Sequence, residues 1–150
     1  HQLNTMENTR VLALDLGEKR IGVAISDQFR MVARGLGTID VNGKEHEKIK
    51  EIVKKYNVAR IVYGVPLRDD GSLSVRAEKM LSFVTKLKNM IKAEFIPWDE
   101  RMTTIEAENI LLMADLSRKK RKKIRDKLAA QIILQSYLDS LYLKNTPLEE

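Results

Sequence analysis

The sequence contains no cysteine, only two histidines and no long apolar run. The absence of cysteine excludes disulfide bonds, thiolate catalysis and cysteine-ligated zinc, and it suits a reducing compartment. His46 has no second histidine nearby with which to bind a metal ion, so we interpret it as a solvated residue in the first turn of a helix. No apolar run approaches the roughly 20 residues of a membrane-spanning helix, and the N-terminus lacks the apolar core of a signal peptide. We therefore expect a soluble cytoplasmic protein with no membrane partner.

The length of 150 residues suits one domain with a hydrophobic core. We expect a single domain over residues 1–150, in which residues 1–5 are an expression scar and residues 144–150 form a loose tail. The formal net charge is +6 and the isoelectric point is about 9.5, which predicts a polyanionic partner. Much of the positive charge lies in the run R-K-K-R-K-K at 118–123, which we expect to form a mobile basic loop.

The periodicity of the apolar residues predicts an α/β fold. We expect two strands within 11–26 joined by a tight turn at Gly17, further strands at 31–41, 59–65 and 93–98, and helices at 44–56, 74–90, 103–113 and 124–143. The first three strands would be antiparallel to one another, and the last two, which follow helices, would lie parallel to the first. The result is a five-stranded mixed sheet flanked by helices.

Asp15 stands inside the apolar run that forms the first strand. Alternation places it on one face with Val11 and Ala13, while three leucines lie on the other face, so the strand should be central. An unpaired charge in such a place costs several kcal/mol, roughly, so the carboxylate should be paired, hydrogen-bonded or bound to a metal ion. The alternative is that Asp15 only caps the turn.

Further acids lie where elements begin and end. Asp99 and Glu100 follow the fifth strand, and alternation does not decide firmly which of them faces Asp15. Asp126 lies in the first turn of the last helix, on the face that carries Ala129, Ala130 and Ile133, three, four and seven residues further on. The alternative is that this acid only complements the helix dipole. Three converging carboxylates without histidine or cysteine suit Mg²⁺ or Mn²⁺. Beside a basic surface they indicate two-metal phosphodiester hydrolysis.

At these residues the sequence resembles the YqgF family, also called RuvX or the Holliday junction resolvase family, within the RNase H-like superfamily. The resemblance extends from 11 to 139 and rests on four blocks in the same order: A-L-D-L-G-E-K-R-I-G-V-A-I-S-D, Y-G-V-P-L-R-D-D-G, D-E-R-M-T-T and R-D-K-L-A-A-Q-I-I-L-Q-S-Y-L. It implies an RNase H-like fold and a metal-dependent nuclease that matures the 5′ end of the small-subunit ribosomal RNA precursor.

The same resemblance selects Asp15, Glu100 and Asp126 as the catalytic, metal-binding carboxylates. Two departures from classical resolvases stand out, because those enzymes carry an acid at the positions of Gly64 and Ala129. An acid within the stretch 99–101 would replace the carboxylate that is missing at Gly64. The cations that we expect to contact nucleic acid are Lys19, Arg20, Arg68, Arg101, Arg118, Lys119, Lys120, Arg121, Lys122 and Lys123.

Several interpretations remain open at this point. Precursor rRNA is the favoured partner, and cleavage of branched DNA junctions by a symmetric dimer is the main alternative. We expect a monomer or a weak homodimer. A basic binding domain without turnover is a third interpretation. A sugar-kinase or actin-like ATPase would also begin with D-x-G on a strand, but the length does not allow the two domains that close on a nucleotide.

Overall fold

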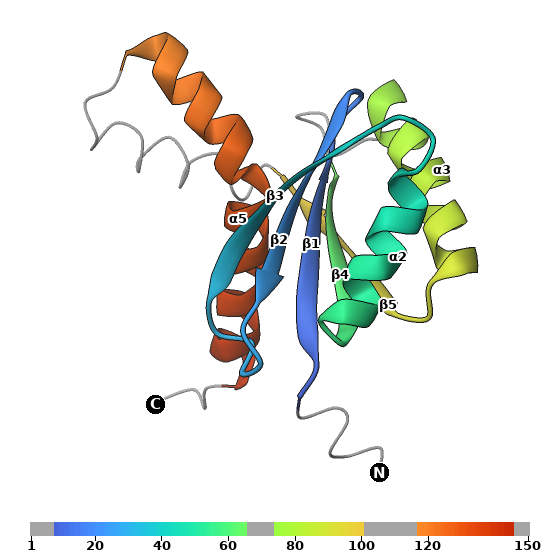
Figure 1. Ribbon diagram of the computed structural model, residues 1–150. Helices are drawn as coiled ribbons and strands as arrows, with labels where there is room; N and C mark the ends of the chain where they lie inside the picture. Colours follow the sequence, from blue (N-terminus) through green and yellow to red (C-terminus); the bar gives the residue numbers. More distant parts are fainter. Residues whose placement is uncertain (1–7, 66–73, 101–116, 146–150) are drawn as a thin grey trace.

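The computed structural model describes residues 8–65, 74–100 and 117–145, which form a mixed sheet with helices on both faces (Figure 1). The strand order is β3-β2-β1-β4-β5. As the sequence predicts, β1, β2 and β3 pair antiparallel, and β4 and β5 run parallel to β1. The elements in chain order are β1 (Arg10–Leu16), β2 (Arg20–Ser26), β3 (Ala33–Asp40), α2 (Glu45–Lys55), β4 (Val58–Val65), α3 (Val75–Met90), β5 (Glu94–Asp99) and α5 (Arg118–Asn145). The predicted helix at 103–113 lies outside the described residues.

Strand β1 is buried on both faces, which makes it the centre of the sheet. Leu12 and Leu14 pack on the side of α2 and α3, whereas Val11 and Ala13 pack against α5. Figure 1 shows α5 on one face of the sheet and α2 with α3 on the other. Apolar surface is buried on each side of the sheet, and each Å² of it contributes roughly 25 cal/mol of stabilisation, which holds these layers together. Asp15 continues the face that α5 covers.

The basic run at 118–123 is helical, and its prediction as a loop is therefore wrong. It belongs to α5, which runs from Arg118 to Asn145 and not from residue 124 to 143. The Ser117 hydroxyl accepts a hydrogen bond from the Lys120 N–H at 3.3 Å, in the manner of an N-cap. Lysine and arginine are good helix formers, so this run extends the apolar helix that follows it.

Side-chain hydrogen bonds fix α5 to the sheet at the turn between β2 and β3. The Asp27 carboxylate accepts the backbone N–H groups of Met31 at 2.8 Å and Val32 at 3.0 Å. Gln135 of α5 accepts the Ala33 N–H at 2.9 Å and donates to the Met31 carbonyl at 3.0 Å. The register of α5 along the sheet is thereby set.

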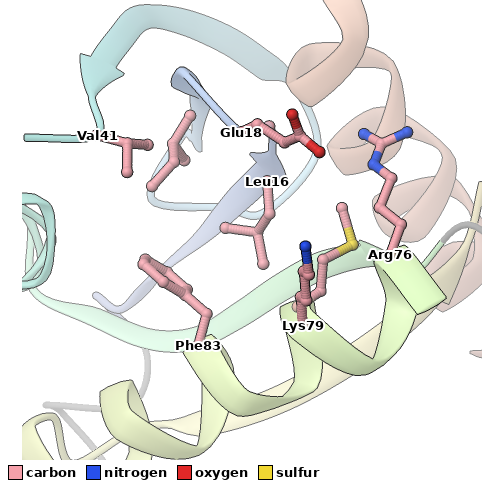
Figure 2. A pocket seen from close by; sticks show the side chains of 9 residues that line it. Leu16, Glu18, Val41, Arg76, Lys79 and Phe83 are labelled. Carbon is pink, nitrogen blue, oxygen red and sulfur yellow. The ribbon is translucent and has the colours of Figure 1, made fainter.

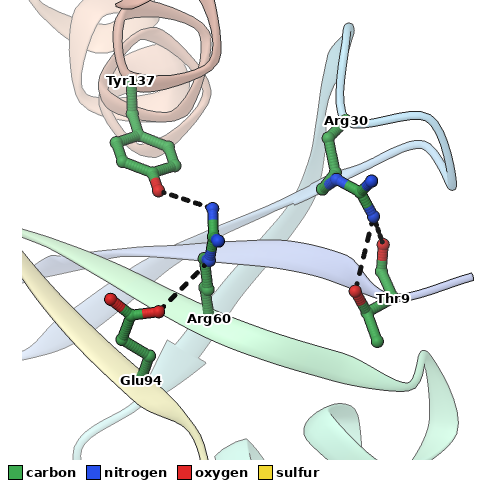
Figure 3. A network of polar contacts seen from close by, with 5 residues as sticks. All are labelled: Thr9, Arg30, Arg60, Glu94 and Tyr137. Atoms are coloured by element: carbon green, nitrogen blue, oxygen red, sulfur yellow. Dashed lines mark hydrogen bonds and ion pairs between the residues drawn. The ribbon is translucent and has the colours of Figure 1, made fainter. Parts of the chain in front are cut away.

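Two arginines join other elements across the molecule (Figure 3). Arg60 of β4 lies 3.3 Å from the Glu94 carboxylate and donates to the Tyr137 hydroxyl of α5, also at 3.3 Å. Arg30 donates to the carbonyl of Thr9 at 3.1 Å. These contacts involve β4, β5, α5 and the residue before β1, so they hold these elements together.

His46 is not solvated, contrary to its interpretation as an exposed helix residue. Its ring lies 4.2 Å from the ring of Phe83, centroid to centroid, and is half-buried between α2 and α3. Burial is the main cause that lowers the pKa of His46, and the nearby charge of Lys86 adds to it. The imidazole is therefore a packing group between the two helices.

None of the helices in the described part of the chain has the length and apolar character of a membrane span.

Candidate active site

Asp15 lies near the C-terminal end of β1, at the edge where the parallel strands β4 and β5 also end. It pairs with Gly22 of β2, and its side chain is half-buried. A Cβ atom at Gly22 would lie 3.4 Å from the Asp15 Cβ and 3.5 Å from the Ala130 Cβ of α5. The Asp15 side chain thus occupies the angle between the sheet and α5.

Gly17 makes the turn that follows Asp15. Its N–H donates to the Arg20 carbonyl at 3.1 Å, and a Cβ atom there would approach the same carbonyl oxygen to 2.5 Å. A side chain at this position is therefore excluded by backbone atoms, which cannot move aside. The tight turn brings Lys19 and Arg20, both exposed, to the same edge as Asp15.

Glu100 follows β5 and folds back over the neighbouring strand. Its N–H donates to the Val65 carbonyl of β4 at 3.3 Å, which continues the pairing of the two strands by one residue. A Cβ atom at Gly64 would lie 2.7 Å from Glu100 Oε1 and 2.8 Å from Ile133 Cδ1. The glycine in β4 therefore leaves the space in which the Glu100 carboxylate lies, underneath α5.

The carboxylates of Glu100 and Asp15 interact directly. The pKa of Glu100 is raised from 4.5 to about 7, first by burial and then by the negative charge of Asp15. The positive charge of Arg76 opposes this shift, a hydrogen bond with Asp15 adds to it, and Asp99 contributes the smallest effect. Two acids that compete for ionisation in a half-buried site are typical of a cation site or of acid–base chemistry.

The structure thus brings together two of the three predicted acids. Asp126 belongs to α5, one turn before the Ala130 that packs beside Asp15, but its side chain lies outside the described part of the chain. No group of three or more acidic or histidine side chains forms among the residues that the structure describes. The role of Asp126 therefore stays a prediction.

The predicted cations divide in the same way. Lys19, Arg20, Lys119 and Lys120 are exposed. Arg68 and Arg101 lie outside the described residues, as do the side chains of Arg118, Arg121, Lys122 and Lys123 in α5. Sequence reasoning missed Arg76, the second residue of α3 after the Ser74 cap, whose charge acts on Glu100. Its position at the start of the helix that follows β4 in the chain was the signal that could have identified it.

The donor set fits a hard divalent cation. Asp15 and Glu100 offer only oxygen ligands, which Mg²⁺ and Mn²⁺ prefer. A cation between them would also relieve the repulsion that raises the Glu100 pKa. The residues present are therefore compatible with a metal-dependent site at this edge.

Comparisons with known proteins agree on the family. The family model described as "RuvX: Holliday junction resolvase" matches residues 9–140. Two relatives, both carrying the name "Putative pre-16S rRNA nuclease", come from Bacillus mycoides and Thermoanaerobacter pseudethanolicus. The first is 45% identical over 135 residues, covering 87% of this chain and 98% of the relative. The second is 48% identical over 134 residues, covering 87% and 96%.

Two of the solved structures that resemble this one are junction resolvases. RuvC of T. thermophilus in complex with a Holliday junction gives a TM-score of 0.57 at 15% identity, covering 93% of this chain and 99% of that chain. Fowlpox virus resolvase with junction DNA gives 0.50 at 14% identity, covering 89% and 99%. At these identities the likeness shows the fold alone, which is the RNase H-like fold. Together with the family match over most of its length, it shows that this chain belongs to the RuvX family.

Proposed function

We propose that this protein is a metal-dependent nuclease that hydrolyses phosphodiester bonds in the precursor of 16S rRNA. The observation that carries the proposal is the Asp15–Glu100 pair, two interacting carboxylates where the parallel strands of an RNase H-like sheet end. The substrate follows from the names of relatives that are 45% and 48% identical. Such a role places the protein in the cytoplasm, as a monomer or a weak homodimer.

Asp15, Glu100 and Asp126 would hold Mg²⁺ or Mn²⁺ in this enzyme. When bound, two such ions supply an activated water and stabilise the leaving oxygen in phosphodiester hydrolysis. The rigid position of Asp15 within β1 and the packing of Glu100 over Gly64 fix the directions of the two carboxylates in advance. Burial and the negative charge of Asp15 oppose the ionisation of Glu100, so a cation bound between the two would favour the charged form of Glu100 at neutral pH.

The cations around this edge would position the substrate. Lys19 and Arg20 stand on the turn next to Asp15, and Lys119 and Lys120 stand in the first turn of α5. Contacts from these side chains to phosphates would orient the strand without reading its sequence. Arg76 adds a positive charge close to Glu100, where a scissile phosphate would carry negative charge.

Cleavage of four-way DNA junctions is the second candidate, because the family model carries that description. A junction enzyme needs two sites on opposed strands and therefore a symmetric dimer. A binding domain without turnover is the third candidate. It would retain nucleic-acid affinity but would show no metal-dependent product.

The test is digestion of a 5′ fragment of precursor 16S rRNA and a four-way DNA junction side by side, with Mg²⁺ or Mn²⁺ and with EDTA. We expect metal-dependent cleavage of the RNA, its loss in Asp15→Asn, and its retention in Asp139→Asn, an exposed acid of α5 that serves as the matched control. Cleavage of the junction alone by a stable dimer would favour the second candidate. Binding without any cleavage would leave the third.

A further inference from the structure

A cavity of about 330 Å³ lies on the opposite side of β1 from the acid pair (Figure 2). Its floor is apolar and is formed by Leu16, Ile21, Met80 and Phe83, which belong to the core cluster on the α2 and α3 face or pack against it. The backbone of the Gly17 turn forms part of its wall. The cavity is therefore a firm apolar recess at the end of the sheet.

The mouth of this cavity carries a net positive charge. Arg76 and Lys79 are both exposed and lie three residues apart on α3, so they project from the same side of that helix. Figure 2 shows Lys79 extending from α3 close to Leu16, and Arg76 farther along the helix with the Glu18 carboxylate directed toward it. Among the described residues, Glu18 is the single acidic side chain of the lining. An apolar recess with two cations at its mouth is complementary to a ligand that joins a flat ring to an anion.

We propose that this cavity binds one nucleotide, with its base against the apolar floor and its phosphate between Arg76 and Lys79. A volume of about 330 Å³ lies at the lower end of small-molecule sites, which run from roughly 300 to 1,000 Å³, so it suits a single base more than a large cofactor. The Phe83 ring gives a base a face on which to stack. The arginine and lysine form charge-assisted hydrogen bonds with phosphate oxygens.

The cavity and the acid pair are neighbours in the chain. Asp15 and Leu16 are consecutive in β1, and alternation sends their side chains to opposite faces of the sheet. Arg76 belongs to the cavity lining, and its positive charge also opposes the upward shift of the Glu100 pKa. A strand that crosses this edge can place one phosphate at the acids and an adjacent nucleotide in the cavity. This extension to a nucleic-acid strand rests on the proposed nuclease function, whereas binding of a free mononucleotide does not.

Titrations in EDTA test the proposal, because no cleavage is then expected. The probes are AMP, CMP, ribose 5-phosphate and a single-stranded RNA of about four nucleotides, followed by calorimetry and by amide NMR shifts. We expect the base-bearing probes to shift the amides of Leu16 and Ile21, and to bind roughly tenfold more tightly than ribose 5-phosphate. Binding of ribose 5-phosphate as tight as that of AMP would overturn the proposal, as would no binding of any probe.

Matched variants separate the cavity from general positive charge. Lys79→Gln and Lys88→Gln remove the same charge from the same helix, but only Lys79 lines the cavity. We expect Lys79→Gln to weaken binding several-fold and to lower the slope of log affinity against log salt by about 0.7, the change expected for one lost contact to a single strand. Lys88→Gln should leave both quantities unchanged. Equal effects of the two variants would refute the site.

Phe83→Leu tests the base-binding part while keeping an apolar side chain in the floor. It should weaken AMP binding roughly tenfold and leave ribose 5-phosphate unaffected, with the melting temperature recorded to confirm that the variant is folded. Tighter binding of the RNA than of AMP identifies a strand as the source of the nucleotide, and the reverse identifies a free mononucleotide; both support the cavity. Asp139→Asn, which changes an exposed acid of α5 outside the cavity lining, should bind the probes like the wild type. If the wild type then cuts no nucleic acid, the proposed function fails and the cavity stands.

Discussion

Replacing Glu100 by Gln should stabilise the metal-free protein at alkaline pH. The pKa of Glu100 is about 7 in the folded protein and 4.5 for the free side chain, so folding disfavours its ionised form. Below about pH 4.5 the carboxyl is protonated in both the folded and the unfolded state, and no penalty exists. The penalty grows as the pH rises and is complete above about pH 7. Glutamine keeps the shape without the charge.

The magnitude follows from the shift. A change from 4.5 to about 7 corresponds to about 3 kcal/mol at about 1.4 kcal/mol for each pH unit. The side chain is only partly buried, and solvent screening reduces the effect, so we expect about 1–2 kcal/mol. For a domain of 150 residues this raises the melting temperature by roughly 2–8 °C. Asp15→Asn should act in the same direction, because it removes the charge that faces Glu100.

Urea unfolding in EDTA at about pH 5 and about pH 8 measures this effect, with the exposed Glu78→Gln as the control. The advantage of Glu100→Gln should be present at the higher pH and nearly absent at the lower one. Added Mg²⁺ should raise the wild-type melting temperature more than that of the variant, because the wild type retains both ligands. A variant less stable than the wild type at about pH 8, or equally favoured at both values, would refute the electrostatic reasoning.

Three further outcomes are expected. Gly64→Ala should destabilise the protein by about 1–3 kcal/mol and abolish cleavage, because the new methyl group collides with the Glu100 side chain; unfolding and cleavage assays measure both. Replacing four cations of the run at 118–123 by serine should weaken RNA binding uniformly across sequences and reduce its salt slope by about 0.7 per lost contact in filter-binding assays. Ser26→Ala should lower the free energy of unfolding by about 1–3 kcal/mol, since the buried hydroxyl accepts the Val11 N–H at 2.8 Å.

The position of β1 at the centre of the sheet could be predicted because its pattern of apolar residues fits only one arrangement. The run before Gly17 is apolar on both faces, and only a strand covered on both sides satisfies it. The same pattern predicted β4 as a buried strand parallel to β1, since the helix α2 connects β4 to the antiparallel strands before it. The prediction for His46 was wrong because its neighbour in the fold comes from a distant part of the sequence. His46 has a polar side chain on a polar helix, and only the arrival of Phe83 from α3 makes it a packing residue.

The basic run was misjudged for a different reason. Charge density indicates solvation, and solvation was taken as a sign of a loop. However, helix propensity does not depend on burial, and lysine and arginine favour the helix even on a fully exposed surface. The Ser117 hydroxyl then supplies the start of α5. The cations of this run therefore stand on a rigid element, along which their spacing is fixed by the helix.

The choice between Asp99 and Glu100 could not be made from alternation because alternation ends where the strand ends. The hydrogen bond from the Glu100 N–H to the Val65 carbonyl extends the strand register by one residue, and this single contact sends the side chain to the α5 face. The second determinant is on a different strand. Gly64 has no side chain, and the Glu100 carboxylate fills the volume that a side chain at position 64 would occupy. This volume holds one carboxylate, which could come either from position 64 of β4 or from the residue that follows β5.

Moving the carboxylate from position 100 to position 64 tests this interpretation. Gly64→Asp alone should be inactive because its Cβ collides with Glu100, and Glu100→Ala alone should be inactive because the acid is lost. Combining the two changes removes the collision with Glu100 and returns a carboxylate to the same face, and the terminal methyl of Ile133, 2.8 Å from the new Cβ, must then rotate away. The double variant should therefore regain metal-dependent cleavage and a Mg²⁺-induced rise in melting temperature that both single variants lack. Strictly additive losses in the double variant would show that the site needs the acid on β5 for a reason other than its place over β4.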